Sequence, residues 1–315
     1  CSTLCRTALS AADWSVARYR FEFLVTSPIN LPDYAGSTLR GTFGRALRRI
    51  ACMTQEKDCK ACPLYQDCAY TNIFEAPAPK EHSLQKFSQI PNGYVFEPPA
   101  WGERQYAVGE KLVFHMVLMG DELARLSLIV YALKKAFQRD VAHGTAELDQ
   151  VWLESTTGET LVYSSEEPTI AAHNASMRLA PPEQTAAVKL NFVTPLRLQN
   201  NGRILSFDEI SAPTFLMALV RRMGLIAEFH FGKKLDVDYS DLRDKSLKSA
   251  FQSNLRWAEF TRYSSRQKKL LNYNGLVGRC GLNNIHPDFL PFLQLGTWTH
   301  VGKGATFGLG KYLME

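Results

Sequence analysis

The residues best suited to chemistry gather in one glycine-rich stretch, His300–Glu315, which reads HVGKGATFGLGKYLME. Glycine has no side chain, so backbone N–H groups in such a loop can approach an anion closely. The two lysines of the stretch add positive charge. The stretch therefore predicts a loop that holds phosphate groups through Gly302, Gly304, Gly308, Gly310, Lys303 and Lys311.

The residues after the glycines indicate which kind of phosphate the loop would hold. A Walker loop or a dinucleotide-binding loop leads into a helix whose N-terminus binds the phosphate, whereas Lys311–Met314 reads as a short strand. We therefore expect the loop to lie at the edge of a sheet and to follow a longer polyanion. The plain alternative is a glycine-rich turn that lets two elements pack closely.

Four of the seven cysteines cluster between residues 52 and 68, with six, two and five residues between successive cysteines. Four thiolates can complete a closed, tetrahedral structural Zn²⁺ site, and an iron–sulfur cluster uses the same number of ligands. We favour zinc over iron–sulfur, while a disulfide between two of the cysteines or no metal at all are the alternatives. The predicted ligands are Cys52, Cys59, Cys62 and Cys68.

Two groups of basic residues are candidates for contact with nucleic acid. One is the polar face of a helix predicted over residues 37–52, with Ser37 as its N-cap, and it carries Arg45, Arg48 and Arg49. The other follows Trp257 and Phe260, and basic residues next to aromatic ones suit phosphate contacts combined with base stacking. This second group consists of Arg262, Arg266, Lys268 and Lys269. Solvated charged surfaces are the alternative for both.

Length and composition fit a globular protein with a sizeable core. The chain has 315 residues, of which 45% are hydrophobic, and a formal net charge of +5. That charge permits nucleic acid as a partner without requiring it. No apolar run reaches the roughly 20 residues that a membrane-spanning helix needs. The odd number of cysteines and their clustering favour a reducing compartment, so we expect a cytoplasmic protein with no membrane partner.

The order of the expected elements repeats once along the chain. Strands at 16–27, 110–119 and 147–165, with helices at 37–52 and 121–138, form a first domain over residues 1–165. Residues 166–185 are acidic and contain prolines, so we predict a linker. Residues 186–315 repeat the order, with strands at 188–198, 255–263 and 274–283, helices at 213–229 and 287–295, and a charged excursion at 235–249. The sequence therefore predicts an α+β fold of two tandem ferredoxin-like (RRM-like) domains with antiparallel sheets.

Several of these segments resemble one known family. The stretch His300–Tyr312 is similar to the C-terminal glycine-rich signature of the CRISPR-associated RAMP-superfamily endoribonucleases that cut precursor crRNA within its repeats. Three more segments are similar to a branch of that family that has an N-terminal cysteine cluster. They are LPDYAGSTLRGTFG at 31–44, CKACPLYQDC at 59–68 and RYSSRQ at 262–267.

The resemblance implies metal-independent RNA cleavage in which a ribose 2′-OH attacks the adjacent phosphate, leaving a 2′,3′-cyclic phosphate and a 5′-OH. Such chemistry needs a base, an acid and cations, and histidine titrates in the right range. We predict His300 first, beside the loop and three residues before Lys303, and His82 second. Many relatives carry a histidine near the first helix, but the stretch 34–49 has none. There we assign Tyr34 to orient the 2′-OH and Arg40 to neutralise the phosphate.

The first functional hypothesis is thus a repeat-RNA endoribonuclease that releases crRNA, needs no cofactor for catalysis and has CRISPR repeat RNA, crRNA and other CRISPR effector or adaptation proteins as partners. The second is a non-catalytic RAMP subunit that binds crRNA within an effector complex. An iron–sulfur redox protein and a general RNA-binding module are further alternatives.

Overall fold

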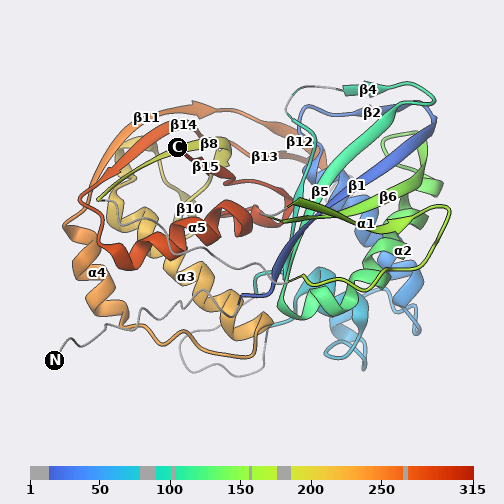
Figure 1. The fold of residues 1–315 in the computed structure, drawn as a ribbon, viewed down its shortest axis with the longest axis horizontal. Coiled ribbons are helices and arrows are strands. Elements are labelled where there is room, and N and C mark those ends of the chain that lie inside the picture. The colour runs from blue at the N-terminus through green and yellow to red at the C-terminus, as the bar shows by residue number, and fades with distance from the viewer. Residues whose placement is uncertain are drawn as a thin grey trace. The chain divides into compact units, whose positions relative to one another are not determined.

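The computed structural model describes residues 14–78, 90–100, 102, 104–155, 158–175, 186–264 and 269–315 (Figure 1). The chain divides into two compact units. The N-terminal unit comprises the described residues of Ser15–Met177 with Phe229–Phe231, and the C-terminal unit comprises Trp14 with the described residues of Arg178–Glu228 and Gly232–Glu315. Within the described ranges, no helix combines the length and apolar character that crossing a membrane requires.

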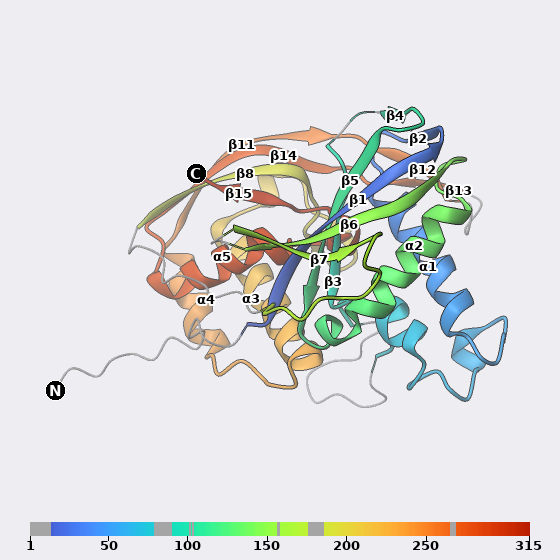
Figure 2. The same cartoon turned by 45° about the vertical axis from the view of Figure 1, so that its right-hand side comes forward.

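The N-terminal unit is built on a five-stranded antiparallel sheet with the strand order β3-β5-β1-β6-β7. Its strands are β1 (Val16–Ser27), β3 (Tyr94–Glu97), β5 (Lys111–Met119), β6 (Thr145–Ser155) and β7 (Gly158–Ser164). Helices α1 (Gly36–Ala51) and α2 (Leu126–Arg139) cover one face of this sheet, as Figure 2 shows. The shorter elements are β2 (Ile29–Leu31), β4 (Arg104–Tyr106), η1 (Cys59–Ala61), η2 (Thr71–Glu75) and η3 (Gly120–Arg125).

Apolar and charged residues alternate along β1, which explains why the sheet has one apolar and one polar face. Tyr19, Phe21 and Phe23 are fully buried on the helix-covered face, while Arg20 and Glu22 lie on the other. Successive residues of a strand point to opposite faces. The strand predicted at 16–27 and its alternation are therefore confirmed. The helix predicted at 37–52 begins one residue earlier, and Ala35 rather than Ser37 is its N-cap.

The C-terminal unit contains a four-stranded antiparallel sheet with the strand order β11-β14-β8-β15. Its strands are β8 (Ala187–Leu196), β11 (Ala250–Ala258), β14 (Gly275–Asn283) and β15 (Tyr312–Met314), and its helices are α3 (Ala212–His230), α4 (Tyr239–Leu247) and α5 (Leu290–Thr299). The shorter elements are β9 (Gln199–Asn200), β10 (Arg203–Ile204), β12 (Thr261–Ser264), β13 (Lys269–Asn272), η4 (Phe207–Glu209), η5 (Pro287–Phe289) and η6 (Ala305–Phe307). Phe192, Phe215 and Tyr312 form the aromatic centre of its core.

Both units have the ferredoxin-like order of elements, which confirms the predicted α+β fold. In each, strand, helix, two strands, helix and strand follow one another, and the first strand lies between the third and the fourth in the sheet. Two details differ from prediction. The excursion at 235–249 contains helix α4, and the described part of the predicted linker packs on the N-terminal unit. There the Ala171 amide donates to the Val162 carbonyl at 2.9 Å, and Ile170 and Ala175 contact the core.

Candidate functional site

The glycine-rich loop is fastened to the end of strand β8 by backbone hydrogen bonds. The Lys303 amide donates to the Arg197 carbonyl at 2.9 Å, and the Gly310 amide donates to the Pro195 carbonyl at 2.9 Å. The Thr194 hydroxyl adds two bonds, donating to the Gly308 carbonyl at 2.8 Å and accepting from the Lys311 amide at 2.8 Å. The loop is therefore a fixed part of the sheet edge, as the sequence predicted.

Its four glycines are required by backbone shape. Gly302, Gly304, Gly308 and Gly310 have φ angles of 88°, 87°, 97° and 70°, a region that glycine adopts without strain. A Cβ atom at Gly310 would lie 1.8 Å from the Val301 carbonyl oxygen. Many backbone amides of the loop already donate to carbonyls of the protein. Fewer N–H groups are therefore available to bind an anion than the sequence predicted. We expect the loop to contact an anion mainly through its side chains.

The two charged candidates of this region differ in accessibility. Lys303 is exposed on the loop, whereas the side chain of His300 is fully buried (0% exposed) where helix α5 ends. Arg222 of α3 fixes this helix end, because its Nε and Nη2 atoms donate to the Thr299 carbonyl at 3.0 and 2.7 Å. A cation is favoured at a helix C-terminus, although burial lowers the pKa of Arg222 to about 10. The role predicted for His300 thus requires its ring to become accessible.

In the N-terminal unit, the predicted residues at the start of α1 also differ in availability. Tyr34 is half-buried just before the helix. The Arg40 Nη2 atom donates to the Phe74 carbonyl at 2.9 Å, and its Cζ atom lies 3.9 Å from the centroid of the Phe74 ring. Burial raises the pKa of the neighbouring Tyr94 to about 12, an effect that Arg40 partly opposes. Arg40 of α1 therefore holds η2 through Phe74. Its predicted catalytic role stays a prediction.

Comparison with known proteins places this geometry in a family. Residues 190–312, which include the glycine-rich loop as far as Tyr312, match the family model of the CRISPR-associated endoribonuclease Cas6. Residues 14–175 match the model of the AF_1859 N-terminal domain. Residues 190–312 therefore carry a domain of the Cas6 endoribonuclease family. This finding confirms the resemblance stated from the sequence, apart from the branch with an N-terminal cysteine cluster.

Solved structures agree with the Cas6 family at the level of the fold. A Cas6 product complex is 14% identical, with a TM-score of 0.58, and the match covers 95% of this chain and 100% of that one. Thermus thermophilus Cas6 is 14% identical, with a TM-score of 0.53 over 96% and 100% of the two chains. A partial Cas6-RT-Cas1–Cas2 complex is 14% identical, with a TM-score of 0.56 over 95% of this chain and 46% of that one. No curated protein sequence matches the chain.

The cysteine segment, Cys52–Cys68, is held by an arginine of α1. Arg48 donates to the carbonyls of Glu56 and Lys57, and its Cζ atom lies 5.8 Å from the centroid of the Tyr70 ring. Arg48 is thus occupied by the protein itself, whereas Arg45 and Arg49 are exposed. Of the three predicted RNA contacts on this helix, the latter two are the more accessible.

The four predicted metal ligands are present as free thiols. Burial raises the pKa of Cys59, and Glu75 adds to the effect while Arg48 opposes it. Among the residues that the structure describes, no three or more His, Cys, Asp or Glu side chains are arranged to hold a metal ion. The four cysteines are thus not arranged around one point as metal ligands, and the zinc predicted from the sequence stays a prediction.

The hairpin β12–β13 carries the second predicted basic group. Arg262 lies in β12 and Lys269 in β13, whereas Arg266 and Lys268 lie outside the described residues. His82, the second histidine candidate, also lies outside them. The predicted RNA contacts of this hairpin therefore stay predictions.

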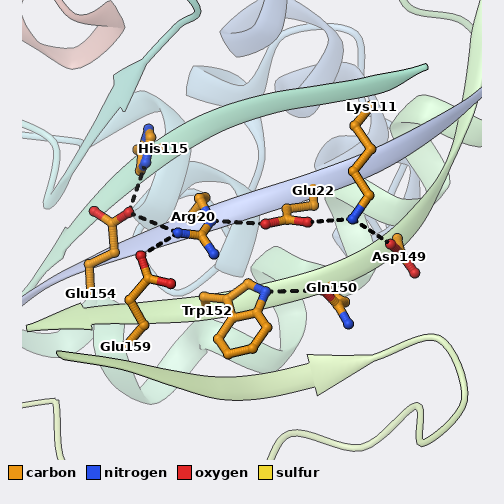
Figure 3. A network of polar contacts seen from close by, with 9 residues as sticks. All are labelled: Arg20, Glu22, Lys111, His115, Asp149, Gln150, Trp152, Glu154 and Glu159. Atoms are coloured by element: carbon orange, nitrogen blue, oxygen red, sulfur yellow. Dashed lines mark hydrogen bonds and ion pairs between the residues drawn. The ribbon is translucent and has the colours of Figure 1, made fainter.

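A polar network on the face of the N-terminal sheet opposite α1 and α2 was not predicted from the sequence (Figure 3). Arg20 pairs with Glu22 at 2.9 Å and with Glu159, and the His115 Nε2 atom lies 3.0 Å from the Glu154 carboxylate. Burial lowers the pKa of His115, and Glu154 partly opposes this effect.

The charge of this network disfavours RNA at that face. Lys111 lies 2.9 Å from Glu22 and 3.4 Å from Asp149, so the four carboxylates drawn in Figure 3 outnumber the two strong cations. An excess of negative charge repels a phosphate backbone. The alternation of charged residues along β1 was the available sequence signal, but their partners on β5, β6 and β7 depend on strand register.

Proposed function

We propose that this chain is an endoribonuclease that cuts CRISPR repeat RNA and releases crRNA. One observation carries the proposal: the part that matches the Cas6 endoribonuclease model ends in a glycine-rich loop that is hydrogen-bonded to the end of β8 and presents an exposed lysine, Lys303. We propose repeat RNA and crRNA as its ligands. Other CRISPR proteins are proposed as partners, because a structure of similar fold is a complex that contains Cas1 and Cas2.

We further propose that cleavage proceeds by attack of the ribose 2′-OH on the adjacent phosphate, without a metal ion. The attack increases negative charge on the phosphate, which a fixed cation stabilises. Lys303 can serve this purpose without rearrangement, since its backbone is anchored to β8 and its side chain is exposed. His300 is the proposed base once a local movement at the end of α5 exposes its ring, and the role predicted for Tyr34 of the N-terminal unit stays a prediction.

The test is cleavage of a panel of labelled CRISPR repeat RNAs in EDTA, each with a 2′-deoxy version at the cut position. We expect one cut, abolished by the 2′-deoxy nucleotide, with a 2′,3′-cyclic phosphate on the upstream product. Lys303→Ala should slow cleavage about a hundredfold, Lys303→Arg should retain most of it, and Lys111→Ala, which removes a paired cation, should leave it unchanged. Cleavage that requires Mg²⁺ and survives the 2′-deoxy substitution would contradict the mechanism.

A second candidate function is a non-catalytic subunit that binds crRNA. The burial of His300 and the absence of histidine from the stretch 34–49 favour it. Tight binding of repeat RNA by the wild-type chain, without cleavage of any RNA in the panel, would establish this function instead.

A further inference from the structure

Arg197, at the end of strand β8, is the residue around which the glycine-rich loop is packed. Its backbone forms a bridge with Gly302, and a Cβ atom at Gly302 would lie 2.6 Å from the Arg197 carbonyl oxygen. On its other side, a Cβ atom at Gly275 would lie 2.8 Å from Arg197 Cγ. Gly302 therefore leaves room for the backbone of Arg197, and Gly275 leaves room for the start of its side chain.

The guanidinium group of Arg197 is only partly engaged by the protein. Its Cζ atom lies 5.5 Å from the centroid of the Tyr273 ring, and Nη2 donates to the Asn272 carbonyl at 3.2 Å. The Nε atom is buried and has no hydrogen-bond partner within the part of the chain that the structure describes. Burial lowers the pKa of Arg197, yet an arginine stays charged at neutral pH. A buried donor on a cation costs free energy unless it is given a hydrogen-bond acceptor.

Tyr273 lies beside this cation, and the ring of Phe307 lies beside Tyr273. The centroids of Tyr273 and Phe307 are 5.3 Å apart, and the ring planes meet at 77°. Both side chains are partly exposed. Phe307 is carried by the short helix η6, between Gly304 and Gly308, and Lys303 precedes that turn as an exposed cation. Aromatic faces and positive charge thus meet at one place in the C-terminal unit.

We propose that Arg197, Tyr273 and Phe307 form a stacking subsite for one unpaired base of a single-stranded RNA, with Arg197 and Lys303 contacting its phosphate. Proteins bind single-stranded RNA by stacking bases on aromatic rings and arginine planes, and by placing cations along the backbone. The arginine fork also matches phosphate geometry. The subsite rests on the proposed function for its ligand, and it adds residues that the sequence did not single out.

The test uses the full chain and a short oligouridine that contains one 2-aminopurine, whose fluorescence is quenched on stacking. The wild type should bind the probe and quench it. Phe307→Ala and Tyr273→Ala should each weaken binding about five- to a hundredfold and remove most of the quench, whereas Tyr273→Phe should retain both. Arg197→Met should weaken binding more than Arg197→Lys. The matched control is Phe207→Ala, an aromatic of the same unit that is 54% exposed and does not belong to the subsite.

The outcomes separate this proposal from the proposed function. Thermal unfolding of each variant shows that a loss of binding does not come from a loss of fold, and Tyr273→Phe preserves the ring in any case. Wild-type affinity and quench in both alanine variants would overturn the subsite, as would a wild-type chain that does not bind the probe. Normal quenching by a chain that cuts none of the repeat RNAs would leave the subsite in place and remove the endoribonuclease proposal.

Discussion

At the scale of single residues, the carboxyl group of Glu122 is the clearest source of pH-dependent stability. Its side chain is fully buried, and Arg125 Nη1 donates to it at 2.8 Å. Burial raises the pKa of Glu122 to about 7, from 4.5, against the smaller effect of Arg125. Between these values the folded chain binds the proton more tightly than the unfolded chain. The contribution is therefore fully present below pH 4.5 and is lost as pH rises through 7.

We expect Glu122→Gln to remove this dependence. From the size of the pKa shift, the wild type should lose about 3 kcal/mol of unfolding free energy through this group between pH 5 and 8, and the variant should lose much less. Urea denaturation at a series of pH values measures this difference. Glu159→Gln, an exposed carboxylate of the sheet network, is the control and should keep the wild-type slope. Identical slopes for Glu122→Gln and the wild type would contradict the assignment.

At the scale of elements, the cysteine segment is ordered although it buries little apolar surface. None of the residues from Cys52 to Cys68 is buried, and the segment is held to α1 by Arg48 and to itself by short turns. A segment that buries so little apolar surface needs another source of order. Four thiolates on one metal ion would provide it, and the metal predicted from the sequence therefore remains a prediction worth measuring.

The measurement is metal content after purification under reducing conditions without chelators. We expect about one zinc per chain and a colourless protein, because zinc has no redox chemistry and an iron–sulfur cluster would be coloured. Cys59→Ser and Cys62→Ser should each lose the metal and lower the melting temperature. Cys280→Ala, which changes a buried cysteine of the C-terminal unit, should keep the metal. A metal-free wild type of unchanged stability would refute the prediction.

The elements also show what the sequence could predict. Strand β1 and helix α1 follow from local periodicity, and their inward faces are the expected ones. Helix α4 was not predicted because its stabilising contacts leave no periodic pattern in the sequence. Asp238 caps the helix, and Lys245 lies 2.7 Å from Asp288, which is distant in the sequence. Arg197 escaped for the same reason, since only the folded chain brings a glycine loop and an aromatic pair to it. His300 is buried where α3 meets the end of α5 through Arg222 and Thr299, a contact between segments that spacing in the sequence does not reveal.

At the scale of the whole molecule, the net charge of +5 does not show which cations are available to bind RNA. On the N-terminal sheet face, Arg20 and Lys111 are already paired with carboxylates. In the C-terminal unit, Lys303 is exposed on the loop, and Arg197 faces carbonyl and aromatic groups. Each phosphate neutralised by a cation releases counterions, so the salt dependence of affinity counts the cations that contact RNA. Paired cations should contribute nothing to that count.

We therefore expect the affinity for a labelled repeat RNA to fall steeply with salt, and the slope of log K against log [salt] to report on individual lysines. Lys303→Ala should reduce the slope by about 0.7, the value for one contact on a single strand. Lys111→Ala should leave the slope unchanged, because Lys111 is already paired with Glu22 and we expect RNA to bind elsewhere. Fluorescence anisotropy titrations at several KCl concentrations give both slopes. A reduced slope for Lys111→Ala, with none for Lys303→Ala, would place the RNA on the N-terminal sheet face and reverse the assignment of surfaces made from charge.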